Sequence, residues 1–521
     1  MRLAGLGLLV LTMSCSGSAA STDGGAEGGG TATGGGAATG GGGGATGGGG
    51  GATGGGGATG GGGATGGGGG AIGTEYFVAP SGLDTNPGTE SAPFRTIQHA
   101  VDVASTAPAT ISLRAGTWAE KVRIANGDTA LLLRAYPGET AIIDGTGLSV
   151  ANGQQGLIDV DGRSHVTIRG LELRNFRSTS SAVPLGIFVT GAGTDLVLED
   201  NHIHDIATTV GSCNGNGGNA FGLAIYGTAA TAWTNVIVRR NELDHLTLGC
   251  SESLSINGNV DGFEVSENLV HDNDNIGIVA IGFEGTAPSA VDQARNGVIR
   301  GNRVWNITSA RNPAYNGERS ADGIYVDGGK QLLIERNQVH GCDLGIEVAS
   351  EHQGRSSAWV MVRNNAVWFS AQAGISLGGY DATVGNADHD VVLHNTLYAN
   401  TVELQLQFHV TETHVQNNVL FNAAGEFTSG STSGVTLTTN LQRSGVASAT
   451  FVTAGLPPDG AVDLRTVSAL DGQVVDRGTP FACPAGWSCP AVWGTPLEGE
   501  RDLAGDPRRA GTGVDLGAWE R

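Results

Sequence analysis

The side chains best suited to chemistry gather between Arg303 and Arg363. Carboxylates at Asp322, Asp327 and Glu347 could hold a divalent cation such as Ca²⁺, or could give and take a proton. Lys330 is a candidate base, although a single lysine beside a glycine turn is also an ordinary solvated residue. Five further residues have the right types to contact a substrate by hydrogen bonding, charge or stacking. They are Arg319, Tyr325, His352, Arg355 and Tyr380.

Two short strands are expected to position these groups. Segments 323–327 and 345–349 alternate apolar and polar residues, so Tyr325, Asp327 and Glu347 point outward. If the two strands stack, Tyr325 and Glu347 are neighbours about 4.8 Å apart, and Asp327 lies roughly 7–8 Å away on the diagonal. Insertions at 308–321 and 350–358 flank this patch and could wall a groove.

An asparagine recurs after a short apolar strand at spacings of roughly 23 to 40 residues, as in a solenoid with turns of unequal length. Stacked amides on successive turns could hydrogen-bond to one another, and asparagine tolerates the left-handed backbone of a tight corner. The repeated residues are Asn201, Asn241, Asn268, Asn302, Asn337, Asn365, Asn395 and Asn418.

A second strand lies between successive asparagines and usually opens with glycine, as at Gly186, Gly323 and Gly345. A further row follows three residues after each asparagine and includes His204, His271 and His340, which we interpret as packing residues. Short strands and fixed polar corners without long helical patterns predict an all-β parallel β-helix spanning residues 74–430. Residues 96–104 have the apolar spacing of an amphipathic helix that caps the first turn. Residues 431–521 are expected to form final irregular turns and a C-terminal cap.

The chain resembles right-handed, single-stranded parallel β-helix proteins of the pectin-lyase-like class over residues 75–521. The resemblance rests on an opening at 76–88 and 93–100, a continuation at 115–122 and 143–145, and a closing pattern at 502–508 and 514–520. It implies the fold and a polysaccharide partner. The sequence lacks the catalytic motifs of polygalacturonases, classical pectate lyases and pectin methylesterases, so no catalytic residue is carried over.

Three chemistries fit the patch within this class. A lyase would use Ca²⁺ on Asp322, Asp327 and Glu347 to neutralise a uronate, with Lys330 as the base. A glycoside hydrolase would use Asp327 and Glu347 as the acid and the base or nucleophile. A non-catalytic surface or adhesion protein would only bind the sugar, with Tyr325 and Tyr380 as stacking platforms.

The amino-terminal segment predicts export. Residues 1–15 read as a lipoprotein signal peptide that ends at Cys15, the expected acylation site, with plain secretion as the alternative. Residues 16–73 are rich in Gly, Ala and Thr and are expected to form a disordered linker. The predicted location is the outer membrane or cell surface, and the lipid would be the only membrane contact.

Cysteine usage and charge limit the partners further. Six cysteines suit an exported protein. Cys483 is expected to pair with Cys489 and Cys213 with Cys250, which leaves Cys342 as a buried thiol. With 28 basic and 50 acidic residues the net charge is −22, so nucleic acid is an unsuitable partner. We expect a monomer.

Overall fold

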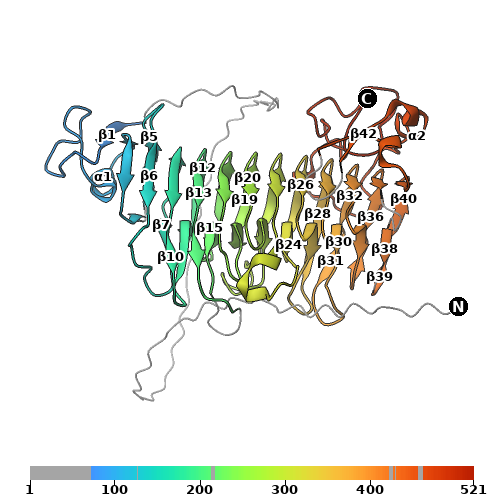
Figure 1. Cartoon of the computed structure of the whole chain (residues 1–521), viewed down its shortest axis with the longest axis horizontal. Coiled ribbons are helices and arrows are strands. Elements are labelled where there is room, and N and C mark those ends of the chain that lie inside the picture. The colour runs from blue at the N-terminus through green and yellow to red at the C-terminus, as the bar shows by residue number, and fades with distance from the viewer. Residues whose placement is uncertain (1–71, 126, 213–217, 422–425, 429, 456–460) are drawn as a thin grey trace, which may run out of the picture. The chain divides into compact units, whose positions relative to one another are not determined.

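The computed structural model describes residues 72–521 except 126, 213–217, 422–425, 429 and 456–460. Within this part, three parallel sheets run side by side along a right-handed β-helix (Figure 1). This confirms the predicted fold class. Cys15 and the predicted linker at 16–73 lie almost wholly outside the described residues.

Sheet 1 is a 16-stranded parallel sheet in which each strand pairs with the strand of the next turn. Its strands are β1 (Thr74–Val78), β2 (Ala109–Leu113), β5 (Leu131–Ala135), β8 (Val166–Arg169), β12 (Gly193–Glu199), β16 (Trp233–Arg239), β19 (Val260–Ser266), β22 (Arg295–Arg300), β25 (Lys330–Glu335), β28 (Ser356–Arg363), β31 (Asn386–Asp388), β32 (Val391–Leu393), β35 (Val410–Thr411), β36 (His414–Gln416), β39 (Thr432–Ser433) and β40 (Thr436–Thr438).

Sheet 2 has twelve short strands. They are β3 (Gly116–Trp118), β6 (Ala141–Asp144), β9 (Leu171–Arg174), β13 (His202–His204), β17 (Glu242–Asp244), β20 (Leu269–His271), β23 (Arg303–Trp305), β26 (Gln338–His340), β29 (Ala366–Trp368), β33 (Thr396–Tyr398), β37 (Val419–Phe421) and β41 (Leu441–Arg443).

Sheet 3 has eleven strands. They are β4 (Val122–Ile124), β7 (Gln154–Asp161), β11 (Val183–Thr190), β15 (Phe221–Gly227), β18 (Leu254–Gly258), β21 (Ile278–Ile281), β24 (Asp322–Asp327), β27 (Leu344–Ala349), β30 (Ala373–Leu377), β34 (Val402–Leu406) and β38 (Glu426–Thr428). A parallel pair, β10 (Arg177–Ser178) and β14 (Ala207–Thr208), stands beside it.

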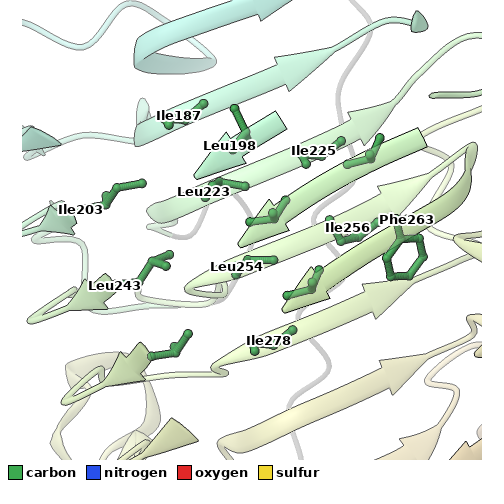
Figure 2. Close-up of a cluster of buried hydrophobic side chains, with 14 of the residues drawn as sticks. Ile187, Leu198, Ile203, Leu223, Ile225, Leu243, Leu254, Ile256, Phe263 and Ile278 are labelled. Atoms are coloured by element: carbon green, nitrogen blue, oxygen red, sulfur yellow. The ribbon is translucent and has the colours of Figure 1, made fainter. Parts of the chain in front are cut away.

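Inward-pointing aliphatic side chains stack from turn to turn and form the core. Ile187 of β11 is in register with Leu223, which is in register with Leu254 and then Ile278. All four are fully buried (Figure 2). Each buried aliphatic side chain contributes about 1.5–3 kcal/mol. Period-two alternation therefore fixes which residues of sheet 3 face outward.

The asparagines form a continuous buried ladder, as predicted. Asn302 Nδ2 donates to Asn337 Oδ1 at 3.0 Å and to the Val265 carbonyl at 3.0 Å. The same pattern runs through all eight predicted residues and ends on Asn440. The predicted reason is wrong in one respect, because the left-handed backbone belongs to the residue before each asparagine. Arg336, for example, has φ 54°.

The glycines that open sheet 3 strands leave no room for a side chain. A Cβ at Gly345 would lie 2.3 Å from Val367 Cγ1 and 2.4 Å from the Gly374 carbonyl oxygen. The glycine row therefore sets how closely successive turns approach, which in turn sets the register of the outward residues beside it.

We expect Gly345→Ala to lower the free energy of unfolding by about 2–3 kcal/mol, because the added methyl must displace the backbone of β30. Urea denaturation followed by circular dichroism measures the change. Gly472→Ala is the control, since its Cβ would have no atom within 4 Å. Equal stability of both variants would show that the turns can separate without cost.

Sheet 2 carries a row of stacked rings on its outer face. The rings of His271 and Trp305 are 4.0 Å apart and those of His340 and Trp368 are 4.5 Å apart, all nearly parallel. The rings face one another along the row, which supports the interpretation of these histidines as packing residues. Further along, Trp368 packs against the C-terminal region.

A histidine–carboxylate pair on sheet 2 should make stability depend on pH. His202 Nε2 lies 2.6 Å from Asp244 Oδ1, and this hydrogen bond raises the pKa of His202. Burial alone would raise the pKa of Asp244, but hydrogen bonds from His202 and His245 lower it to about 2. The stabilisation is therefore complete between about pH 4 and 6.5 and is lost as pH rises through the raised pKa of His202.

We expect wild type to lose more stability between pH 5.5 and 8.5 than His202→Gln does, because only wild type has this proton to lose. Urea midpoints at the two pH values measure the difference. Identical losses in both proteins would rule out the pair as the source.

A helix covers the first turn of the solenoid, whereas the C-terminal elements pack on its side. At the start, α1 (Ile97–Val103) buries Ile97, Ala100 and Val101 against the first turns, as the predicted cap requires. Beyond β41, the antiparallel strands β42 (Phe451–Ala454) and β43 (Val462–Thr466) and helix α2 (Asp471–Val474) pack on the outer rings of sheet 2.

The C-terminal segment differs from the cap expected for residues 431–521, since it runs back along the side of sheet 1. Trp493 Nε1 donates to the Leu332 carbonyl at 2.9 Å. Arg363 in turn donates to the Trp493 carbonyl at 2.8 Å. Apolar side chains on the outer face of sheet 1, including Leu333 and Met361, explain why the segment covers the side of the solenoid.

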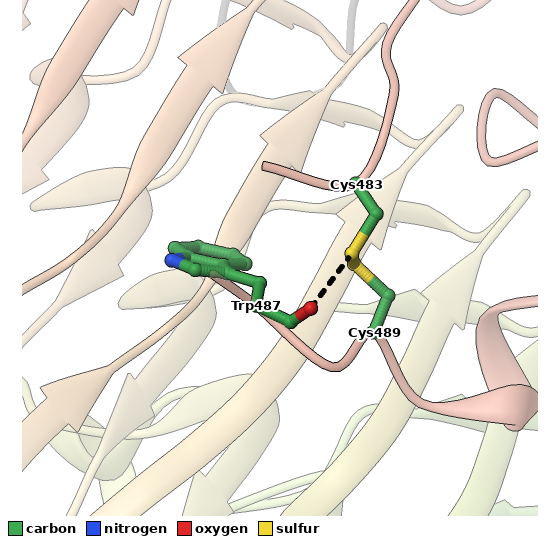
Figure 3. Close-up of a disulfide and its surroundings, with 3 residues drawn as sticks. All are labelled: Cys483, Trp487 and Cys489. Atoms are coloured by element: carbon green, nitrogen blue, oxygen red, sulfur yellow. Dashed lines mark hydrogen bonds between the residues drawn. A yellow bond between two sulfur atoms is a disulfide. The ribbon is translucent and has the colours of Figure 1, made fainter. Parts of the chain in front are cut away.

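The described cysteines can be compared with the predicted pairing. Cys483 and Cys489 form the expected disulfide, which closes a loop that carries Trp487 (Figure 3). Cys250 is also disulfide-bonded, whereas its predicted partner Cys213 lies outside the described residues. Cys342 is a buried free thiol, as predicted. In the described part of the chain, no helix is both long and apolar enough to span a bilayer.

Candidate functional site

Six of the carboxyl groups on the outer face of sheet 3 and its adjoining loops form a cluster, here called the acidic face. They come from four successive turns and are Glu252, Glu284, Asp322, Asp327, Glu347 and Glu351. Burial raises the pKa of all six, and the charges of other carboxylates raise it further for all of them except Glu351. Such a concentration of buried acid costs stability and is typical of functional sites.

Asp322 and Glu347 form a carboxyl pair. Asp322 begins β24 and Glu347 lies on β27. Each carboxyl perturbs the pKa of the other, as expected of two buried acids that share one proton. Burial and the neighbouring charge raise the pKa of Asp322 well above its usual range. Burial raises the pKa of Glu347 to about 7.

Two neutral donors hold Glu347 in place. Ser376 Oγ donates to Glu347 Oε1 at 3.0 Å, and Gln407 Nε2 donates to the same oxygen at 3.1 Å. Gln407 Nε2 also donates to Ser376 Oγ at 2.8 Å. These neutral donors stabilise the ionised form of Glu347, but less than a positively charged side chain would. The pair therefore keeps a proton near neutral pH.

A second group lies at the opposite end of β24. Asp327 accepts a hydrogen bond from the Glu351 N–H at 2.8 Å, and Glu351 is the strongest charge acting on it. Burial and this charge raise the pKa of Asp327 well above its usual range. One ligand atom each of Glu284, Asp327 and His352 lies within 4.8 Å of the others.

Tyr325 lies between the two ends. It is paired in register with Glu347, as predicted, and is 5% exposed. Burial raises the pKa of its hydroxyl, as do the charges of Asp327, Glu351, Glu347 and Asp322. Tyr325 therefore stays neutral and separates the two groups of acids.

The structure places the three predicted calcium ligands in two separate groups. Asp322 contacts Glu347, whereas Asp327 belongs with Glu284 and His352. Among the described residues, the predicted set of Asp322, Asp327 and Glu347 is not one of the groups whose ligand atoms lie within reach of one ion.

The other predicted site residues lie on different elements around the acidic face. Lys330 begins β25 of sheet 1, in register with Arg295, and so lies around the corner from Asp327. Arg319 Nη1 donates to the buried Asp343 at 2.9 Å, which anchors loop 308–321. Arg355 lies over the Phe283 ring at 5.0 Å, beside His352. Tyr380 is half-buried in the loop after β30.

Sequence reasoning missed Glu252 and Glu284. Neither follows the outward alternation of a strand, since Glu252 precedes β18 and Glu284 follows β21. Glu284 and Glu351 do share one signal, because both stand in insertions that follow sheet 3 strands. An alignment of the insertions turn by turn would have predicted that Glu284 and Glu351 lie close to each other.

The arrangement can move protons and attract cations. The Asp322–Glu347 pair is a proton donor near neutral pH, and an ionised carboxylate in the second group can accept one. Arg355 and His352 supply donors beside them. An anionic ligand would be repelled here unless a cation or protonation reduced the charge.

Comparisons with known proteins give matches to two family models, to a relative and to a solved structure, and the first of the family models agrees with this fold. The model of the right handed beta helix region matches residues 186–389, and that of a protein family of unknown function, DUF1565, matches residues 80–124. Pectate lyase PEL9 of Emericella nidulans is 33% identical over 151 residues, 26% of this chain and 33% of that protein. The crystal structure of pectate lyase Pel9A aligns over 86% of this chain and 96% of that one, with a TM-score of 0.45 and 16% identity.

A longer match identifies the family. The uncharacterized protein YwoF of Bacillus subtilis is 37% identical over 358 residues, which are 67% of this chain and 75% of that protein. The matched sequence is long enough to include most turns of the solenoid. This chain therefore belongs to the same family as YwoF, and its own fold is a right-handed parallel β-helix.

Proposed function

We propose that this protein hydrolyses glycosidic bonds of a polysaccharide on the acidic face of sheet 3. The observation that carries the proposal is the Asp322–Glu347 pair, two carboxyls on the neighbouring strands β24 and β27 that perturb each other and whose pKa values are both raised. A carboxyl that is protonated near neutral pH can donate to the leaving oxygen of a sugar.

The second group supplies the complementary base. Asp327 lies two residues beyond Tyr325, the register partner of Glu347. The diagonal offset is roughly 7–8 Å, and carboxyls about 6.5–9.5 Å apart leave room for the water used in hydrolysis with inversion. Near neutral pH, a single ionised carboxylate shared between Asp327 and Glu351, whose pKa is raised to about 7, would activate that water while the Asp322–Glu347 pair protonates the leaving group.

The charge favours an uncharged polysaccharide. The acidic face is anionic, and the whole chain has a net charge of −22. A uronate polymer would be repelled by both. Tyr380 offers a ring, and Arg355 offers donors, for sugar ring faces and hydroxyls, whereas the predicted stacking role of Tyr325 is ruled out because its ring is buried.

A panel of neutral and acidic polysaccharides tests the reaction class. Hydrolysis releases reducing ends without ultraviolet absorbance, and we expect this with a neutral polymer. Asp322→Asn should lose the activity, while Glu264→Gln, an acid on sheet 1, should keep it. Reducing ends unaffected by Asp322→Asn would contradict the assignment.

A second candidate is metal-assisted elimination of a uronate, favoured by the proximity of Glu284, Asp327 and His352. A cation there, Ca²⁺ included, would offset the repulsion of an acidic sugar. Elimination gives an unsaturated, ultraviolet-absorbing product that chelation abolishes. A third outcome, binding without any product, would support the adhesion alternative.

We further propose that the protein is exported and anchored by a lipid on Cys15. The support comes from the sequence of residues 1–15 and from the disulfides, which suit an oxidising compartment. Metabolic labelling with a radioactive fatty acid should label wild type and not Cys15→Ser. Label on Cys15→Ser would exclude this attachment site.

A further inference from the structure

We propose that Glu284, Asp327 and His352 form a binding site for a divalent transition-metal ion on the acidic face. The three residues come from three successive turns, one from the loop after β21, one from the end of β24 and one from the loop after β27. One ligand atom from each lies within 4.8 Å of the others. The inference does not depend on the proposed hydrolysis, since a metal can be held whether or not sugar is cleaved.

His352 provides the observation that points to a ligand. Its Nε2 is enclosed by the protein and has no hydrogen-bond partner. Leaving a buried polar atom unpaired is costly, so such atoms usually have a partner. An imidazole nitrogen without a hydrogen-bond partner is available to bind a metal ion.

Hydrogen bonds from neighbouring residues orient the two carboxylates of the proposed site, Glu284 and Asp327. Asn257 is fully buried, and its Nδ2 donates to Glu284 Oε2 at 2.9 Å. The Glu351 N–H donates to Asp327 Oδ1 at 2.8 Å. Outer hydrogen bonds of this kind orient metal ligands and remain when the ion binds. Neither carboxylate is paired with a cationic side chain in the hydrogen bonds and ion pairs of the described residues.

The donor set indicates the class of ion. One imidazole nitrogen with two carboxylate oxygens suits Zn²⁺, Mn²⁺ or a similar ion, whereas Ca²⁺ takes six to eight oxygens. Ligand atoms bound at about 2.0–2.2 Å to one ion lie roughly 3–4 Å apart, so small side-chain shifts would close the site. Three protein ligands leave open positions for water or a sugar hydroxyl.

Direct binding to the full chain tests the site. Protein stripped with a chelator and dialysed is titrated calorimetrically with Zn²⁺, and separately with Ca²⁺. We expect Zn²⁺ to bind more tightly than Ca²⁺, with affinity falling at least tenfold in His352→Gln and in Glu284→Gln. Unfolding midpoints measured without metal check that both variants are folded.

The second potential cluster in the described residues, His202, Glu242 and Asp244 on sheet 2, provides a matched control. His202→Gln removes its imidazole and should leave the affinity within threefold of wild type. The proposal is overturned if wild type does not bind Zn²⁺, if Ca²⁺ binds more tightly, or if His202→Gln rather than His352→Gln loses the binding.

Discussion

Glu347→Gln is expected to abolish glycosidic cleavage while making the protein more stable at pH 8. The amide cannot supply the proton for the leaving group, and removing a general acid typically lowers kcat about 10²–10⁴-fold. The same change removes a charge that burial disfavours, since the pKa of Glu347 is raised to about 7. A carboxyl whose pKa is raised by folding favours the folded state only while it is protonated, and this contribution is lost as pH rises from about 4.5 to 7. The folded state of wild type is therefore destabilised at pH 8.

The gain should be roughly 1–3 kcal/mol, measured as the difference in urea unfolding free energy between variant and wild type at pH 8 and again at pH 4.5. At pH 4.5 the difference should shrink, because wild type is then protonated. Glu264→Gln on sheet 1 is the control for both assays. A loss of activity together with a loss of stability would indicate a structural role for Glu347.

Asn302→Ala is expected to cost about 3–5 kcal/mol of unfolding free energy, among the largest effects of a single change in this protein. Asn302 is fully buried. Its side chain donates to Val265 and Asn337 and accepts from the N–H and Nδ2 of Asn268. Alanine leaves these buried groups without partners in a place that water cannot enter.

Asn440→Ala is the matched comparison at the end of the ladder. Asn440 is only partly buried, and its Oδ1 accepts from Asn418 Nδ2 at 2.9 Å. Water can replace part of what this variant loses, so we expect about 1–2 kcal/mol. Urea denaturation under identical conditions compares the two. Similar costs at both positions would mean that burial does not set the strength of the ladder.

The fold is predictable because its causes are local and repeated. The asparagine corners, the glycines and the period-two alternation recur in turn after turn, and each turn packs only on its neighbours. The same regularity is sufficient to predict that Tyr325 lies beside Glu347. The sequence did not predict that the residue before each asparagine has a left-handed backbone, because residue types as different as Arg336 and His394 adopt it.

Sequence by itself determined the parallel β-helix, its amino-terminal cap, the buried thiol of Cys342 and the outward carboxylates of two strands. Only the tertiary structure decided which acids meet, namely Asp322 with Glu347, and Asp327 with Glu284 and His352. It also decided that the C-terminal segment covers sheet 1. The physical reason is that strands repeat a geometry that residue spacing encodes, whereas loops of unequal length place their side chains through packing between turns.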